Sequence, residues 1–216
     1  MDSNILAIYN TLLAHHGDLK WWPAKSPYEV IVGAVLTQNT AWGNVEKAIS
    51  NFADNLSPNF VLDASTEELE IIIRPAGFYK QKALYLKAVT MWYARYNFDV
   101  QTVQEKPLDK IRRELLAVKG IGKETADSIL LYAFGYATFV VDAYTMRLCE
   151  RFPIDIEKKY DVVKAYFESN LERDAEIYNH YHALIVINGK EYCRKTKPLC
   201  DKCPLGEKCA KDISLK

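Results

Sequence analysis

The chain has 216 residues, of which 49% are hydrophobic and 26% are charged, and this composition excludes an intrinsically disordered protein. Its 28 Lys and Arg residues balance 28 Asp and Glu residues, which excludes a strongly basic protein. Uncharged runs such as residues 129–141 are too short to span a bilayer, and the first residues do not resemble a signal peptide. We therefore expect a globular, cytoplasmic protein that has no membrane partner.

Apolar residues recur at helix spacing along almost the whole chain. The sequence predicts helices over residues 4–15, 27–36, 45–56, 69–74, 79–96, 108–117, 123–134, 143–151, 161–170 and 175–187. No segment alternates with a period of two for long enough to predict a strand, and only residues 139–141 fit a short extended stretch. The pattern predicts an all-α fold.

Aromatic and polar residues flank the second predicted helix. Trp21 and Trp22 precede it, and Gln38, Asn39 and Trp42 follow it. Adjacent tryptophans commonly pack in a core, and an asparagine commonly ends a helix, so purely structural roles are open for these residues. Aromatic faces can also stack on a flat ligand, which is the functional alternative.

A glycine-rich turn joins the helices predicted on either side of residues 117–122. Gly120 and Gly122 permit a tight turn or the close approach of a ligand. Amide groups at the start of the following helix favour a phosphate, and Lys119 and Lys123 flank the turn. An ordinary turn between two helices is the alternative. A dinucleotide site is disfavoured because no predicted strand precedes the glycines.

Asp142 ends the long uncharged run and precedes the helix predicted over residues 143–151. Its residue type and position predict the N-cap of that helix. Amide groups of the first turn would keep its carboxylate ionised in apolar surroundings. Such a carboxylate can activate water and stabilise a developing positive charge, so Asp142 is a candidate catalytic residue.

Four of the five cysteines lie close together near the C-terminus, with the spacing C-x6-C-x2-C-x5-C: Cys193, Cys200, Cys203 and Cys209. Disulfides are disfavoured in the cytoplasm, and a zinc site more often has two close pairs, so an iron–sulfur cluster is favoured. Residues 190–216 carry a net charge of +4. Arg194, Lys195 and Lys197 lie between the first two cysteines, where they either contact an anion or are simply solvated.

The remaining candidates are predicted to be structural. Cys149 and Trp92 lie on apolar helix faces and are expected in the core. The histidine pairs at residues 15–16 and 180–182 do not share a helix face, so we expect surface or hydrogen-bonded core residues and no local metal site.

The motif Val-Lys-Gly-Ile-Gly-Lys at residues 118–123, the aspartate 18 residues after Glu124 and the four cysteines occur together here. This combination resembles the endonuclease III superfamily of helix-hairpin-helix DNA glycosylases, which carry a [4Fe–4S] cluster. The resemblance covers about residues 25–209. It implies that the four cysteines hold that cluster and that Asp142 corresponds to the family's conserved aspartate.

The resemblance also implies two helical domains. A six-helix barrel would cover residues 21–132, with the helix-hairpin-helix at about residues 108–134. Residues 1–20 and 133–216 would form a discontinuous cluster domain. The partner would be double-stranded DNA whose damaged base flips into the cleft between the domains. A monomer in the bacterial cytoplasm, associated with the nucleoid, is expected.

Glu124 departs from the bifunctional members of this superfamily. Those members carry a lysine at this position, which attacks the sugar and forms a Schiff base. A glutamate cannot do so. The resemblance therefore implies a monofunctional glycosylase with absent or weak strand cleavage, although Lys119 and Lys123 lie nearby in the sequence.

The two-tryptophan segment, the Leu-Thr-Gln-Asn-Thr-Ala-Trp segment and the hairpin together look like the bacterial 3-methyladenine DNA glycosylases described from Helicobacter. Electron-rich rings suit a cationic alkylated purine. We therefore expect a base pocket formed by Trp21, Trp22, Trp42 and Glu124. The Helicobacter type is reported to lack the cluster cysteines, so this chain departs from it.

DNA contacts are expected from residues in three segments. Gln38 and Asn39 would fill the gap left by the flipped base, and the hairpin and the basic loop would contact phosphates: Lys119, Gly120, Gly122, Lys123, Arg194, Lys195 and Lys197. Two other functions stay open. One is a glycosylase with AP lyase activity on oxidised pyrimidines, which Glu124 disfavours. The other is a non-catalytic DNA-scanning module, which the buried acid Asp142 disfavours.

Overall fold

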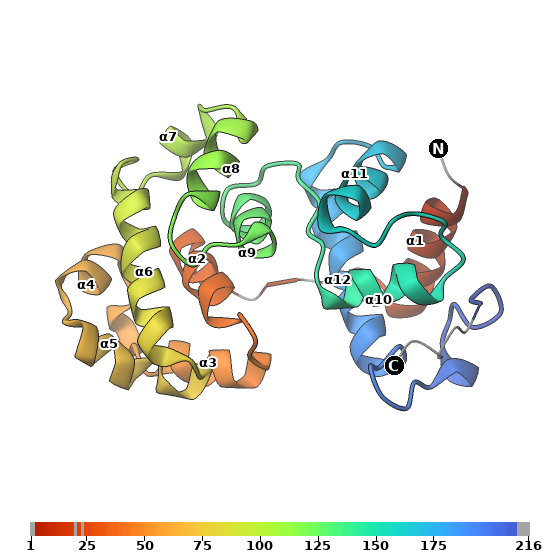
Figure 1. Cartoon of the computed structure of the whole chain (residues 1–216), viewed down its shortest axis with the longest axis horizontal. Helices are drawn as coiled ribbons and strands as arrows, with labels where there is room; N and C mark the ends of the chain where they lie inside the picture. Colours follow the sequence, from red (N-terminus) through yellow and green to blue (C-terminus); the bar gives the residue numbers. More distant parts are fainter. Residues whose placement is uncertain (1–2, 20, 23, 211–216) are drawn as a thin grey trace. The chain divides into compact units, whose positions relative to one another are not determined.

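The computed structural model describes residues 3–19, 21–22 and 24–210. These residues form helices and connecting loops and contain no β-strand (Figure 1), which confirms the predicted all-α class. The α-helices are α1 Ser3–His16, α2 Pro27–Leu36, α3 Trp42–Ser50, α4 Pro58–Asp63, α5 Thr66–Ile72, α6 Tyr79–Ala94, α7 Val100–Gln104, α8 Leu108–Leu116, α9 Lys123–Ser128, α10 Ala143–Arg151, α11 Tyr160–Asn170 and α12 Ala175–Glu191.

Local sequence signals set many of these boundaries. The Ser26 side chain accepts a hydrogen bond from the Glu29 amide at the start of α2, and Pro27 occupies the first helical position. Asp174 caps α12 in the same way, accepting from the amides of Glu176 and Ile177. Such caps satisfy amide groups that would otherwise lack a partner.

The short helices α4 and α7 and the π-helix Ile129–Ala133 were not predicted. The predicted helix over residues 45–56 is wrong in its bounds, because α3 starts at Trp42 and ends at Ser50, followed by a 3-10 turn. The predicted helix over residues 123–134 divides into α9 and the π-helix Ile129–Ala133. Helices α4 and α7 are too short to give a recognisable apolar period.

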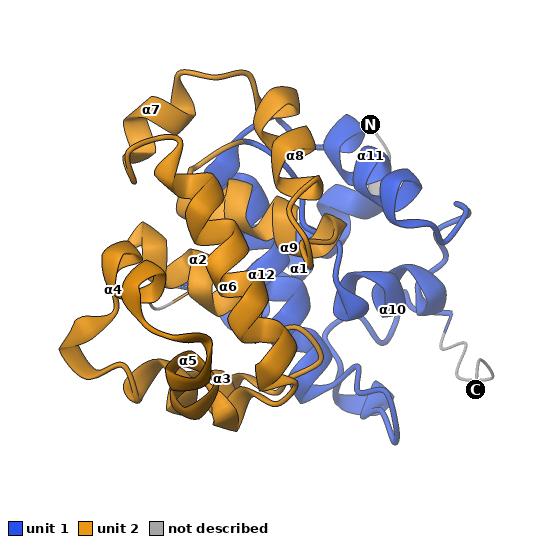
Figure 2. Ribbon diagram, turned by 60° about the vertical axis from the view of Figure 1, so that its left-hand side comes forward, with its two compact units in different colours: residues 1–21, 137–216 blue, residues 22–136 orange. Residues whose placement is uncertain are grey.

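The chain divides into two compact units (Figure 2). Unit 2 is continuous and covers residues 22–136, whereas unit 1 combines residues 1–21 with residues 137–216. The predicted barrel covers residues 21–132, whereas unit 2 runs from Trp22 to Tyr136. Both ends of the chain therefore belong to unit 1.

Unit 2 is built around α2. Residues 30–36 are all buried, and α2 contacts α3, α6, α9 and the π-helix. A helix that is apolar on every side fits only such a central position. Trp92 is 3% exposed in the core of this unit, which confirms its predicted structural role.

Unit 1 is built around α12, which packs against α1 and α10. The α1 stripe Ile5, Ile8 and Leu12 is fully buried. Phe139 stacks on Phe167 with ring centroids 4.3 Å apart. No helix in the described ranges is long and apolar enough to cross a membrane.

Candidate functional site

Asp142 is the N-cap of α10, as the sequence predicted. Its Oδ1 atom accepts hydrogen bonds from the amides of Tyr144 (2.9 Å) and Thr145 (2.8 Å) and from the Thr145 hydroxyl (3.1 Å). One carboxylate oxygen is thus occupied by the first turn of the helix. The position of Asp142 follows from its own helix and needs no distant contact.

The second oxygen of this carboxylate faces α12. His182 Nε2 lies 3.6 Å from Asp142 Oδ2, and His182 is 5% exposed. Burial alone would raise the pKa of Asp142, but the nearby His182 imidazole and the hydrogen bonds from Thr145 lower it by more. The pKa of Asp142 therefore lies below the ordinary value, and the carboxylate is ionised at neutral pH.

A close approach of α10 and α12 brings these two residues together. A Cβ on Gly189 would lie 2.4 Å from Cδ1 of the Tyr144 ring, so only glycine fits at this position of α12. Arg147, one turn along α10, stacks over the Tyr144 ring at 4.8 Å and donates to the carbonyl of Cys193 (2.6 Å). The first turn of α10 is therefore fixed against α12 from two sides.

The four clustered cysteines follow the end of α12. Each is partly buried, and no disulfide joins any of the five cysteines. Burial raises the pKa of the Cys203 thiol, and the nearby Cys193 and Cys209 raise it further. In the described part of the chain, no set of three or more His, Cys, Asp or Glu side chains has a geometry that could hold a metal ion.

Cys149 lies apart from this group in the core of unit 1. It is 1% exposed, and burial raises the pKa of its thiol to about 12. Its predicted structural role is confirmed.

The basic loop between the first two cysteines is held through its backbone. Arg151 of α10 donates to the carbonyls of Arg194 (2.7 Å) and Lys195 (3.2 Å), and its guanidinium also lies 3.4 Å from Cys193 Sγ. The side chains of Arg194, Lys195 and Lys197 are exposed. The loop is thus anchored while its three cations face solvent.

The hairpin between α8 and α9 belongs to unit 2. Gly120 has φ +84°, and a Cβ there would lie 2.3 Å from the Tyr85 ring, so this turn requires glycine. Lys119, Lys123 and Gly122 are exposed. Two cations therefore flank an exposed turn whose backbone is close to the surface, as expected of a phosphate contact.

A buried ion pair connects the two helices of the hairpin. Arg112 of α8 binds Asp127 of α9 through two hydrogen bonds, at 2.8 and 3.0 Å, and Asp127 is fully buried. Paired planar groups of this kind fix relative orientation as well as distance.

Gln38 is tied to the hairpin. Its Nε2 donates to the Gly120 carbonyl (2.9 Å) and to the Thr125 hydroxyl (3.0 Å). Asn39 is exposed and adopts a left-handed backbone with φ +51°. The structure thus places the two predicted DNA-contacting residues differently, with Gln38 against the hairpin and Asn39 at the surface.

A buried lysine holds the loop that carries these residues. Lys82 is 2% exposed, and its ammonium donates to Leu36 O, Thr40 Oγ1 and Ala76 O, each at 2.8 Å. Thr40 also donates to Ala76 O (2.5 Å). Two residues beyond Ala76, Phe78 is 64% exposed with φ +47°. An aromatic ring is therefore presented to solvent beside the loop.

Trp22 and Trp42 lie together in unit 2, with ring centroids 5.4 Å apart. Trp22 also stacks on Tyr132 at 4.9 Å, and Trp42 Nε1 donates to Glu46 (2.9 Å). Both tryptophans are partly exposed. This cluster combines packing within the unit with aromatic surface that a ligand can reach.

Trp21 and Glu124 complete the predicted pocket residues. Trp21 belongs to unit 1, where Lys190 Nζ lies 5.5 Å from the centre of its ring. Glu124 is exposed in the first turn of α9. A carboxylate therefore stands at the place where the bifunctional relatives are expected to have lysine.

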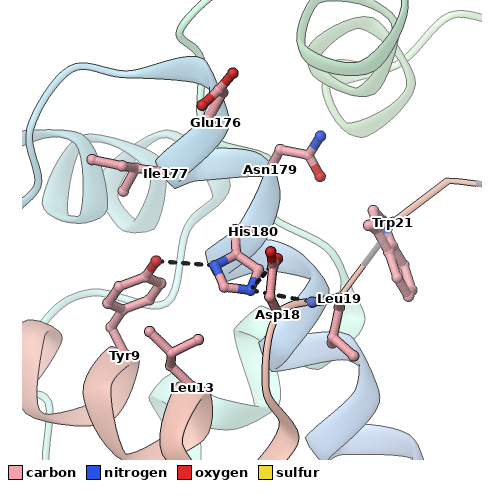
Figure 3. Close-up of a pocket in the computed structure, with 9 residues that line it drawn as sticks. All are labelled: Tyr9, Leu13, Asp18, Leu19, Trp21, Glu176, Ile177, Asn179 and His180. Carbon is pink, nitrogen blue, oxygen red and sulfur yellow. Dashed lines mark hydrogen bonds and ion pairs between the residues drawn. The ribbon is translucent and has the colours of Figure 1, made fainter.

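A separate surface cavity of about 650 Å³ lies in unit 1 (Figure 3), lined by Tyr9, Leu13, Asp18, Leu19, Trp21, Glu176, Ile177, Asn179 and His180. His180 Nε2 accepts from the Leu19 amide (3.4 Å) and lies 3.4 Å from Asp18 Oδ1, while its Nδ1 is 3.0 Å from the Tyr9 hydroxyl. Through these contacts, His180 connects α12 to the segment that follows α1.

Four residues of these sites were missed by the sequence predictions: His182, Lys82, Phe78 and Tyr132. The histidines were expected to be surface or hydrogen-bonded core residues; His182 is buried, but its place beside Asp142 was not predicted. No local pattern marks it, because its role depends on how α10 meets α12. For Phe78, the one sequence signal is an aromatic residue that directly follows a glycine, Gly77.

The sequence pattern of the HhH-GPD superfamily base excision DNA repair proteins matches residues 32–173. The chain belongs to this superfamily. It is also 50% identical over 210 residues to the candidate DNA repair glycosylase MJ1434 of Methanocaldococcus jannaschii, covering 95% of each chain. Endonuclease III of Sulfolobus acidocaldarius is 28% identical over 189 residues, covering 86% of this chain and 82% of the relative.

Solved structures agree with this assignment. A DNA-bound covalent intermediate of endonuclease III has a TM-score of 0.81 at 22% identity, covering 100% of this chain and 99% of that chain, which establishes the fold. The H. pylori 3-methyladenine DNA glycosylase bound to 1,N6-ethenoadenine has a TM-score of 0.73 at 29% identity, covering 87% and 96%. The resemblance to the endonuclease III superfamily is confirmed. The chain is a DNA glycosylase of base excision repair.

Proposed function

We propose that the protein is a monofunctional DNA glycosylase that removes alkylated purines such as 3-methyladenine. The observation that carries the proposal is Asp142, an ionised carboxylate with one oxygen engaged by the helix, together with a glutamate at position 124. The likeness to the H. pylori 3-methyladenine glycosylase supports the choice of base.

Asp142 would have two roles, because it would stabilise the positive charge on the sugar and accept a proton from water. As the bond between C1′ and the base breaks, its electron pair leaves with the base, and the carboxylate stabilises the positive charge on the sugar. Water attacks C1′, and its proton passes to Asp142 Oδ2. A cationic base leaves as a neutral molecule and needs no separate acid, which suits a site with a single ionised carboxylate.

Aromatic rings would hold the flipped base. Trp22, Trp42 and Tyr132 form a partly exposed cluster in unit 2. The negative faces of such rings attract a cationic purine more than a neutral one. Glu124 of unit 2 and Trp21 of unit 1 are also proposed to contact the base, and the Glu124 carboxylate would add to the preference for a cation.

Three further segments would contact the DNA duplex. Phe78 presents an exposed ring that can enter between base pairs, as apolar wedges do, and Asn39 is exposed beside the loop that Lys82 holds. Gln38 would support the hairpin to which it is bonded. The exposed lysines of the hairpin and the exposed cations of the basic loop would contact phosphates.

We further propose that Cys193, Cys200, Cys203 and Cys209 hold a [4Fe–4S] cluster. Their donor set fits, because four thiolates are the ligands that such clusters take. A Cβ on Gly206 would lie 2.5 Å from the Cys200 carbonyl, which shows how tightly the loop turns here. When bound, the cluster supplies iron–sulfur bonds that tie residues 193–209 into one fixed loop. Iron and sulfide analysis of the purified protein checks this, and finding neither would contradict it.

Base release from a duplex containing 3-methyladenine tests the proposed function. The wild type is expected to release the base, and Asp142→Asn is expected to lose at least about a hundredfold in rate, because the neutral amide cannot take the proton. Asp174→Asn is the matched control, since Asp174 caps α12 through the same pair of amide contacts and lies outside the proposed site. It should release the base at the wild-type rate.

Borohydride trapping on the same duplex separates the alternatives. A monofunctional enzyme gives no covalent adduct, whereas an AP lyase is trapped through a Schiff base. An adduct, or release of thymine glycol without release of 3-methyladenine, would overturn the proposal in favour of an enzyme for oxidised pyrimidines. Binding without release of either base would indicate a scanning module.

A further inference from the structure

A buried histidine lies against the carboxylate that the proposed reaction uses. We propose that His182 is a positioning residue for Asp142: its Nε2–H group holds Oδ2 in place and keeps the carboxylate ionised beside the reacting sugar. This inference rests on the proposed function. It assigns a role to a residue that makes no contact with DNA in the proposed reaction.

The two oxygens of Asp142 have different partners. Oδ1 is engaged by three donors of α10 at 2.8 to 3.1 Å, so its direction is set by the helix cap. Oδ2 points toward α12, where His182 Nε2 lies 3.6 Å away. A carboxylate oxygen can accept more than one hydrogen bond, so Oδ2 can face the imidazole and a water molecule together.

The burial of His182 argues against a purely space-filling role. The imidazole is 5% exposed and lies edge-on to the Phe139 ring, at 6.5 Å and 85°. Neighbouring buried positions of α12 hold leucine, isoleucine and valine. An apolar side chain would fill such a position without the penalty of burying a polar ring. An imidazole can interact with the Asp142 carboxylate that it faces, whereas an apolar side chain cannot.

Other ionisable groups on the packed elements are engaged elsewhere. On α10, Arg147 and Arg151 donate to carbonyls of residues 189–195, and on α11 Glu168 pairs with Lys164 and accepts from the Phe139 amide. Tyr181 of α12 donates to the Ile5 carbonyl, and the buried Tyr178 packs edge-on to Phe139, with burial keeping its hydroxyl protonated by raising its pKa. On α1, His16 lies 3.8 Å from Glu191. Among the described residues, His182 is the ionisable side chain that faces Asp142 Oδ2.

The consequence for the reaction follows from burial. In apolar surroundings a carboxylate tends to take up a proton and lose its charge. A protonated Asp142 could neither stabilise the sugar cation nor accept a proton from water. His182 opposes this protonation, so its removal should restrict activity to higher pH.

Two substitutions of His182 test the role. His182→Gln keeps a neutral N–H donor of similar reach, and His182→Leu removes the donor at similar volume. Single-turnover release of 3-methyladenine is measured for each from pH 4.5 to 9. We expect the acid limb of the His182→Leu profile to move to higher pH, with a rate at least about tenfold below wild type at pH 5 and a smaller deficit at pH 8. His182→Gln should recover much of the rate.

His15→Gln serves as the control. His15 is exposed on α1 and hydrogen-bonds the Tyr192 hydroxyl, away from Asp142. Its pH profile should match that of the wild type. A His182→Leu profile that also matches wild type in position and height would overturn the proposal.

A second readout needs no substrate and stays informative if His182→Leu is poorly folded. The melting temperatures of Asp142→Asn, His182→Gln and the double variant form a cycle with the wild type. If the two side chains interact, the change in melting temperature of the double variant should differ from the sum of the two single changes by about 2–4 °C. A double change equal to that sum would overturn the proposed pairing of His182 with Asp142. Failure of the wild type to release any methylated base would overturn the proposed function and leave this cycle unaffected.

Discussion

Lys82 is buried with its ammonium group surrounded by three oxygen acceptors at 2.8 Å. None of these acceptors carries a negative charge, so burial lowers the pKa of Lys82 to about 8. The lysine thus connects the end of α2, the Gln38 loop and the turn before Phe78. Its substitution should affect both the stability of unit 2 and the order of this loop.

We predict that Lys82→Met lowers the free energy of unfolding by about 3 kcal/mol at pH 7, because three buried acceptors lose their donor. Between pH 8 and 10.5 the unfolded chain binds a proton that the folded chain has released, so the Lys82 contribution to stability increases with pH in this window. The difference between wild type and variant should therefore widen from pH 8 to 10.5. Denaturant unfolding at several pH values measures it, and a constant difference would contradict the prediction.

At the residue scale, local signals were predictable and distant partners were not. Asp142 could be placed as an N-cap because a cap involves only the next three residues. His182 lies 40 residues later, and its position depends on the contact that Gly189 allows between α12 and Tyr144. Lys82 likewise looks like an ordinary helical lysine until α2 and α6 are packed together.

The hairpin helices α8 and α9 illustrate how an element depends on one buried contact. Asp127 is fully buried, and its charge is balanced by the two-bond contact with Arg112. Removing one member of such a pair leaves an uncompensated charge in the core. Replacing both members with apolar residues avoids that penalty.

We predict that Arg112→Met lowers the free energy of unfolding by about 3–5 kcal/mol. The double variant Arg112→Met/Asp127→Leu should recover most of this loss, because no charge is then buried. Chemical denaturation measures both. Arg113→Met is the control, since Arg113 is exposed on the same helix and bonds the Asp109 carbonyl in its own helix, at 3.2 Å. Equal losses in Arg112→Met and the control would contradict the prediction.

The helices themselves were largely predictable, because apolar residues at helix spacing and the capping signals agree over most of the chain. The bounds of α2 and α10 were predicted at both ends. The π-helix Ile129–Ala133, whose Tyr132 stacks on Trp22, was not predicted, because the sequence pattern does not distinguish it from the α-helix that precedes it. Helices α4 and α7 are stabilised by tertiary contacts that a short sequence window does not contain.

At the scale of the whole molecule, exposed cations occur in both units although the chain has no net charge. Unit 2 contributes Lys119 and Lys123, and unit 1 contributes Arg194, Lys195 and Lys197. Each cation that contacts a phosphate releases counterions, so DNA affinity should fall steeply as salt increases.

We predict that replacing either group of cations with glutamine makes log Kd less dependent on log salt, by about one unit of slope for each lost phosphate contact. Fluorescence anisotropy with a labelled duplex at several salt concentrations measures the slope. Lys159→Gln is the control, because Lys159 is exposed and paired with Glu157. A wild-type affinity independent of salt would contradict the assignment of both groups.

Unit 1 contains the first helix of the chain and also the last, and this arrangement has a consequence for synthesis on the ribosome. Helix α1 emerges early, but its partner α12 begins ~160 residues later. At about 5–20 residues per second, α1 waits for roughly 8–30 s. Unit 2 is continuous and can fold during this delay. The stripe of Ile5, Ile8 and Leu12 has no helix to pack against until α11 and α12 appear, so the nascent chain exposes an apolar segment that chaperones and proteases can recognise.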